Sequence, residues 1–241
     1  MKRPARHRWP RRLVCALLAL FLVSLAPVAL LRFVDPPTSA FMLARQWDMR
    51  NEPGFALRQT WADIEAISPR LLIALVAAED QNFPNHHGFD LDAISSALAA
   101  RGKGGASRGA STISQQVAKN LFLWSGRSWL RKGVEAYYTF LIETLWPKRR
   151  ILEVYANIAE FGDGIYGAQA AAQHFYGIPA ARLDARQSAA LAAVLPNPRR
   201  YRVEAPTPYQ QRRRAWIERQ AVQLGGPAWL AECCGIGESS R

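Results

Sequence analysis

Ionisable side chains are densest directly after an apolar segment, within residues 71–90. Leu71, Leu75 and Glu79 follow one another at intervals of four residues, so in a helix they share one face and Glu79 extends an apolar stripe. A carboxylate in such a position is partly removed from water, which raises its pKa and suits it to accept a proton near neutral pH. Glu79 is therefore a candidate general base.

Four more polar side chains follow this carboxylate. The apolar helix is expected to break at Pro84, and Asp80, His86, His87 and Asp90 lie around that break. In an alternative interpretation their tasks are structural: His86 would cap helix carbonyls and Asp90 would cap the next helix. These residues alone leave both interpretations open.

Residues 111–123 are expected to form a helix that begins with a capping hydroxyl. This helix carries Gln116, Lys119 and Asn120. Because amides are costly to bury without partners, these side chains are expected to face either solvent or a polar ligand. For Lys119 the simplest interpretation is a surface lysine, and a phosphate ligand is the alternative.

A further helix is expected over residues 128–146. Arg131, Lys132 and Glu135 lie within one turn and a half of it, where ordinary ion pairs along one helix face would explain them. Residues 101–110, which precede the helix expected over residues 111–123, are glycine-rich and basic, but they lack the spacing of a phosphate-binding P-loop. We expect them to form a loop that becomes ordered when substrate binds.

The elements that would position these side chains are helical. No alternating run of strand-forming residues follows the N-terminal apolar segment, so the predicted fold class is mainly α. The later helices are expected within residues 148–162, 164–177, 184–195 and 206–224.

An apolar segment near the N-terminus predicts a membrane anchor. Residues 13–31 carry no charge, and nineteen residues are about enough to span a bilayer core. Six Lys and Arg and no acid in residues 1–12 predict a cytoplasmic N-terminus, with the rest of the chain outside. A cleaved signal peptide is the rival, but cleavage after Ala26 would leave Pro27 as the first residue. Trp124, Trp129 and Leu130 suit either the membrane interface or a core.

The net charge of the 241-residue chain is +12, which fits an anionic partner such as nucleic acid, anionic lipid or a phosphate-bearing substrate. Nucleic acid is disfavoured because the basic domain would lie outside the cytoplasm. The three cysteines match neither a disulfide scaffold nor a metal-ligand spacing.

Four motifs in order resemble those of the peptidoglycan glycosyltransferases of family 51, the polymerising half of bifunctional penicillin-binding proteins. The motifs are residues 79–90, 109–120, 131–135 and 150–157. Without Ser-x-x-Lys or Lys-Thr-Gly sequences, the chain resembles the monofunctional members. Ala110 and Ala156 depart from the usual pattern without removing a reacting group.

The resemblance implies a lysozyme-like helical domain with a small membrane-facing lobe, preceded by one N-terminal transmembrane helix. The implied organisation is a basic cytoplasmic tail (1–12), an anchor (13–31), a membrane-proximal linker (32–66), a glycosyltransferase domain (67–225) and a C-terminal tail (226–241). The implied location is the cell inner membrane, single-pass, with the catalytic domain in the periplasm.

The resemblance also implies an activity: polymerisation of lipid II into β-1,4-linked glycan strands, with inversion and release of undecaprenyl pyrophosphate. Glu79 would be the general base, and Glu135 would orient the donor phosphate, with Mg²⁺ or Mn²⁺ as a candidate ion near it. The implied substrate-binding residues are Asp80, Phe83, His86, Ser111, Thr112, Gln116, Lys119, Asn120, Arg127, Arg131 and Lys132. Implied partners are lipid II, the growing lipid-linked chain, the membrane and other cell-wall synthesis or division proteins.

Two rivals remain. A lysozyme-like lytic transglycosylase or hydrolase would share the helical fold and one catalytic Glu, but it has no use for a cluster of phosphate-binding cations. A non-catalytic anchored protein that recruits other wall-synthesis factors would leave Glu79 and Glu135 as ordinary helix charges.

Overall fold

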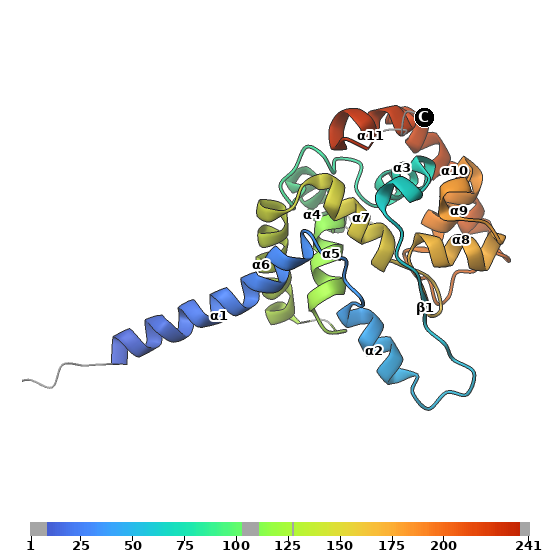
Figure 1. The fold of residues 1–241 in the computed structure, drawn as a ribbon. Helices are drawn as coiled ribbons and strands as arrows, with labels where there is room; N and C mark the ends of the chain where they lie inside the picture. Colours follow the sequence, from blue (N-terminus) through green and yellow to red (C-terminus); the bar gives the residue numbers. More distant parts are fainter. Residues whose placement is uncertain (1–8, 103–110, 127, 237–241) are drawn as a thin grey trace, which may run out of the picture.

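The structure is a computed structural model that describes residues 9–102, 111–126 and 128–236. Arg127 and most of the glycine-rich segment, residues 103–110, lie outside the described residues. The predicted fold class is confirmed: the described chain is mainly α-helical, with one long apolar helix leading into a helical domain (Figure 1).

The first helix, α1 (Trp9–Leu31), projects away from this domain. Among the described residues it is the one helix long and apolar enough to cross a membrane, over Arg11–Leu31. The remaining helices, in chain order, are α2 (Ala40–Asp48), η1 (Ile64–Ala66), α3 (Pro69–Glu79), α4 (Leu91–Gly102), α5 (Ile113–Phe122), α6 (Trp129–Leu145), α7 (Lys148–Ile158), α8 (Ala168–Tyr176), η2 (Ala180–Arg182), α9 (Ala185–Val194), α10 (Pro208–Gln223) and α11 (Gly226–Cys234).

The helices form two groups joined by α7. Helices α4, α5 and α6 lie on the side of α1, and α3 with α8 to α11 form the larger group on the other side (Figure 1). Helix α5 packs on both α6 and α7, and α3 packs on α9, α10 and α11. The end of α3 and the side of α5 therefore meet at the boundary between the groups.

Helix α3 is the central element of the larger group. All seven residues from 71 to 77 are buried, so the helix is enclosed on every side and not on one face as the spacing suggested. It also ends earlier than expected, at Glu79 and not at Pro84. The chain leaves helical geometry at Asp80, whose side chain turns to the start of α5.

The last two turns of α1 pack against the smaller group. Val28 is fully buried, and the Trp146 indole donates a hydrogen bond to its carbonyl at 2.7 Å. The hydroxyls of Ser24 and Tyr137 lie 2.7 Å apart. The Arg150 guanidinium donates hydrogen bonds to the carbonyls of Leu31, at the end of α1, and of Val34, so the end of this helix is fixed to the domain.

The mainly helical domain also contains a small three-stranded sheet, which the sequence did not indicate. Its order is β1 (Arg58–Gln59), β3 (Ile165–Tyr166), β2 (Glu160–Gly162), with β1 parallel and β2 antiparallel to β3. Strands of two or three residues are too short to show alternation, so the pattern could not reveal them.

Each of the helices expected from the sequence after α1 is present, but those expected within residues 148–162 and 164–177 are shorter than predicted, because residues 160–162 and 165–166 form β2 and β3. Two further α-helices were not expected, α2 within the linker and α11 within the segment taken as a tail, and neither were the short 3₁₀ helices η1 and η2. Helix α11 contributes the fully buried Leu230 and packs on α3.

Candidate active site

Glu79 ends α3 at the boundary between the two helix groups. Its side chain is only 16 % exposed. The Gln116 amide donates a hydrogen bond to its Oε2 at 2.9 Å, and the Arg213 guanidinium of α10 lies 3.2 Å from Oε1. Burial raises the pKa of Glu79, and Gln116, Arg213 and Lys119 partly oppose that rise. The carboxylate is thus held in place and made more basic, as a general base requires.

The amide that holds Glu79 is itself bound on its other side. The Tyr155 hydroxyl of α7 donates a hydrogen bond to Gln116 Oε1 at 3.3 Å. Tyr155 is 1 % exposed, and burial raises its pKa well above the ordinary value for a phenol. Its hydroxyl therefore keeps its proton at any working pH.

A cluster of cations begins one helical turn along α5 from Gln116. Burial lowers the pKa of Lys119, while the negative charge of Glu135 on α6 acts in the opposite direction. Glu135 is 2 % exposed and is bound by Arg131 Nη1 at 2.9 Å and Lys132 Nζ at 2.5 Å. Since α5 packs on α6, one face of α5 joins the buried carboxylate to this cationic group.

Asp80 and His86 form a buried network beneath the site. The Asp80 carboxylate lies 2.9 Å from His86 Nε2 and accepts a hydrogen bond from the Ile113 amide at the start of α5, also at 2.9 Å. Thr112 caps α5 and donates a hydrogen bond to the Gly88 carbonyl. Gly88 has φ +85°, and an added Cβ would meet Thr139 at 2.7 Å, so only glycine fits there.

Phe83 is fully buried in the same region, with the Lys148 ammonium 4.6 Å from its ring centre. Lys148 also donates hydrogen bonds to the His86 carbonyl at 2.6 Å and to Glu143 at 2.8 Å. These contacts tie the turn after α3 to α6 and α7, so they fix the position from which Glu79 projects.

Most of the residues expected at the site fall into two sets. Glu79, Gln116, Lys119, Arg131, Lys132 and Glu135 come together along α3, α5 and α6. Asp80, Phe83, His86 and Thr112 are buried behind them, in contacts with the protein itself. Ser111 is exposed and Asn120 is half-buried on α5, and Arg127 lies outside the described residues.

Two residues at the site were not assigned from the sequence. Arg213 lies in the helix expected within residues 206–224, and Tyr155 lies in the fourth motif, residues 150–157, but neither was given a role. The run of three arginines at 212–214 could have suggested an anionic contact, but which of the three turns inward depends on how α10 packs on α3.

A divalent ion near Glu135 does not fit the residues as they are arranged. Both of its carboxylate oxygens are already bound by cationic side chains. Within residues 9–102, 111–126 and 128–236, no group of three His, Cys, Asp or Glu could hold a metal. We derive no step that passes through an ion.

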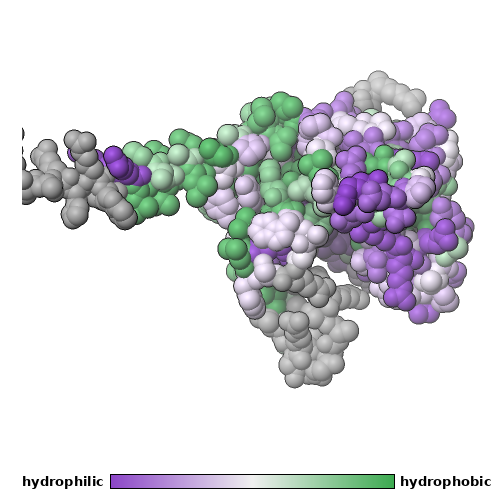
Figure 2. Space-filling view, turned by 90° about the horizontal axis from the view of Figure 1, so that it is seen from below, coloured by the Kyte–Doolittle hydropathy of each residue, from purple (hydrophilic) through white to green (hydrophobic). Residues whose placement is uncertain are grey.

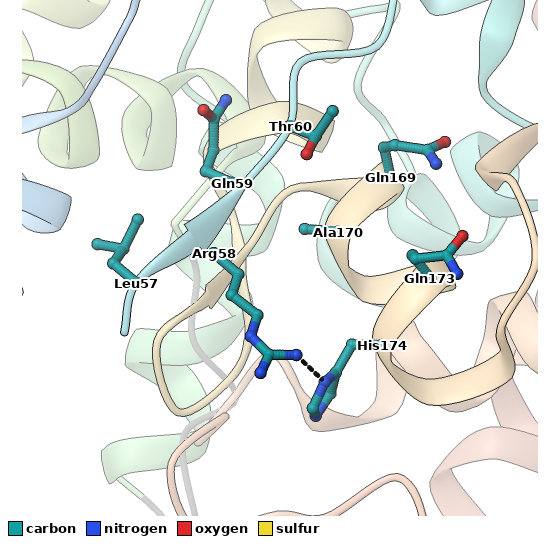
Figure 3. Close-up of a pocket in the computed structure, with 8 residues that line it drawn as sticks. All are labelled: Leu57, Arg58, Gln59, Thr60, Gln169, Ala170, Gln173 and His174. Carbon is teal, nitrogen blue, oxygen red and sulfur yellow. Dashed lines mark hydrogen bonds between the residues drawn. The ribbon is translucent and has the colours of Figure 1, made fainter. Parts of the chain in front are cut away.

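A separate hollow of about 610 Å³ lies between β1 and α8 (Figure 3). Arg58 crosses it to His174, with 3.0 Å between Nη1 and Nδ1. The described residues that line it include none of those expected at the site.

A desolvated carboxylate beside a group of cations, on a helical domain with an apolar anchor, defines a class of protein: an enzyme with one base and a place for an anionic group. The comparisons with known proteins identify the family. A family model described as "Transglycosylase" matches residues 49–222, and the chain belongs to that family.

Curated relatives are similar over nearly the whole chain. A protein named "Biosynthetic peptidoglycan transglycosylase" from Xylella fastidiosa (strain 9a5c) is 60 % identical over 229 residues, 93 % of this chain and 94 % of the relative. Proteins of the same name from Xanthomonas campestris pv. campestris (strain B100) and Xanthomonas oryzae pv. oryzae (strain KACC10331 / KXO85) are 58 % and 57 % identical. In both comparisons 94 % of each chain is covered. These findings confirm the family that the four motifs suggested.

Proposed function

We propose that this chain is a peptidoglycan glycosyltransferase that polymerises lipid II into β-1,4-linked glycan strands in cell-wall synthesis. The relatives' shared name, biosynthetic peptidoglycan transglycosylase, supports the reaction. The observation that carries it is a buried Glu79 at the end of α3, hydrogen-bonded to Gln116 on α5. One turn further along α5, Lys119 borders the Arg131 and Lys132 pair.

In the proposed reaction, Glu79 removes the proton from the 4-hydroxyl of the acceptor sugar. The hydroxyl oxygen forms a bond to C1 of the donor as the bond from C1 to the phosphate oxygen breaks. An α-linked donor then gives a β-linked product in one displacement. Glu79 releases its proton to solvent, and the pyrophosphate leaves with the bonding electrons.

The leaving group needs cations more than it needs an acid. Pyrophosphate carries its own negative charge, so no carboxylic acid has to protonate it, and fixed positive charges stabilise the charge that develops. Lys119, Arg131 and Lys132 take this role, with Arg127 as a further candidate. Glu135 holds Arg131 and Lys132 in place and favours the charged form of Lys119.

For the buried residues we propose positioning roles. Asp80 binds the first amide of α5, so it fixes the helix that carries Gln116 and Lys119. His86, Phe83 and Thr112 support the same turn. Ser111 and Asn120, which are more accessible, remain candidates for direct contact with substrate.

The anchor fits an enzyme whose substrate stays in the membrane. We propose an inner-membrane location, with the N-terminus in the cytoplasm and the domain in the periplasm. Apolar surface covers α1 and continues onto the adjoining part of the domain, while the far side is largely hydrophilic (Figure 2). Trp129 and Leu130, 93 % and 73 % exposed, would lie at the lipid surface, close to the lipid tail of the substrate.

Two assays on the full-length protein in detergent test the reaction. The proposal expects glycan polymer from labelled lipid II and no release of soluble glycan from purified cell-wall sacculi. Soluble glycan without polymer would instead indicate the lytic transglycosylase or hydrolase, and neither product from a folded protein would indicate the recruiting protein.

A further inference from the structure

Tyr155 is a buried titratable residue to which the proposed mechanism gives no task. We propose that Tyr155 is a positioning residue for Glu79 and acts through the side-chain amide of Gln116. The inference rests on the proposed role of Glu79 as general base.

Three helices supply one chain of hydrogen bonds. Tyr155 on α7 donates to Gln116 Oε1 at 3.3 Å, and Gln116 Nε2 on α5 donates to Glu79 Oε2 at 2.9 Å at the end of α3. Each member is restrained: Tyr155 is 1 % exposed, Gln116 is half-buried and the Glu79 side chain is 16 % exposed.

As a donor to Gln116 Oε1, the hydroxyl supports the orientation in which the amide NH₂ faces Glu79. A glutamine amide has an acceptor end and a donor end of nearly the same shape, and the network around it selects between them. Because the phenol donates to the oxygen, the amide must present its NH₂ to Glu79. With the opposite orientation the amide oxygen would face a carboxylate oxygen, and only a protonated Glu79 could hydrogen-bond to it.

The phenol is suited to this task at every working pH. Burial, together with the negative charges of Glu79 and Asp80, raises the pKa of Tyr155 well above that of a free phenol. The hydroxyl therefore remains a donor while Glu79 gains and loses its proton.

Other groups also act on Glu79, and their contributions have known directions. Burial raises its pKa, and the positive charges of Arg213 on α10 and Lys119 on α5 lower it, as does the bond from Gln116. Loss of the Tyr155 hydroxyl frees the amide to turn over. The ionised form of Glu79 then loses a donor, so its pKa rises.

The test is the pH dependence of kcat/KM for lipid II polymerisation by Tyr155→Phe, which keeps the ring in the core. Tyr176→Phe is the matched control, since the Tyr176 hydroxyl lies outside the site, 3.5 Å from the Gln187 carbonyl. We expect the acid limb of the pH profile of Tyr155→Phe to move up by about one pH unit. This shift corresponds to the free energy of about one hydrogen bond to a charged group. At pH values above the shifted limb the rate should return to near that of the wild type. Tyr176→Phe should keep the wild-type profile.

An equal loss of rate at every pH, or an unmoved acid limb, would overturn the positioning role. Thermal unfolding of each variant separates these results from a general loss of structure. Glu79→Gln distinguishes failure of this inference from failure of the proposed function. If Glu79→Gln is inactive and Tyr155→Phe has an unmoved limb, only the role of Tyr155 is wrong; if Glu79→Gln polymerises normally, the base assignment is wrong as well.

Discussion

Arg213 offers the sharpest perturbation of the proposed base, because its charge acts on Glu79 without an assigned task in the reaction. Its Nη2 lies 3.2 Å from Glu79 Oε1. At that separation, an effective dielectric constant of about 20 gives an attraction of roughly 5 kcal/mol. The two side chains are 19 % and 16 % exposed, so water screens the pair and we expect roughly 1–3 kcal/mol, or about one to two pKa units.

Replacement of Arg213 by Met keeps much of the apolar stem and removes the charge. The pKa of Glu79, already raised by burial, then rises further, so at neutral pH less of the carboxylate is ionised. We expect the acid limb of the pH profile of kcat/KM for lipid II polymerisation to move up by about one to two pH units, with the rate returning to near that of the wild type above the shifted limb.

Arg212→Met provides the matched control, because Arg212 is the exposed neighbour on the same helix and the change in net charge is identical. Its pH profile should match the wild type within about 0.3 units, as expected for a screened surface charge. If both variants shifted the acid limb equally, or neither did, the reasoning about the Arg213–Glu79 pair would be refuted.

Three further results are expected. Asp80→Ala leaves a buried α5 amide and a buried imidazole without their acceptor, so it should cost about 3 kcal/mol and lower Tm by roughly 6–12 °C in thermal unfolding; an unchanged Tm would contradict the buried network. Glu135→Gln removes the negative charge that opposes the lowering of the Lys119 pKa by burial, so Lys119 loses its proton at a lower pH. KM for lipid II, measured across pH, should therefore rise most on the alkaline side. Because the pKa of Glu79 is higher in the folded than in the unfolded state, its ionisation destabilises the fold as pH rises through that window. Melting curves should therefore show Glu79→Gln gaining stability relative to wild type as the pH rises above about 4.5.

Local sequence signals were enough to predict most of the helices. The capping hydroxyls before α5 and α6 and the Ser68-Pro69 start of α3 mark helix ends through short-range contacts. The strands were missed because each is only two or three residues long, and β1 in addition pairs with residues about a hundred positions away, as Arg58 does with Ile165. Their sequences carry no alternation from which such pairing could be predicted.

The site was predictable where its residues lie in motifs and unpredictable where packing alone brings them together. Glu79, Gln116 and Lys119 were named from the sequence and do lie around the same boundary. Arg213 reaches Glu79 from 134 positions away, and nothing in its own segment separates it from its two neighbours. Nor could the spacing of residues in the motifs distinguish side chains that face the site from those buried behind it. Asp80 and His86 are of the second kind.

The most direct test of the account is polymerisation of labelled lipid II by the full-length wild-type protein and by Glu79→Gln, at matched concentration and with matched melting curves. Glutamine keeps the shape and the hydrogen-bonding capacity of the side chain but cannot take up a proton at working pH. The account predicts polymer from the wild type and almost none from the variant. Comparable polymer from both proteins would contradict the assignment of Glu79 as the general base.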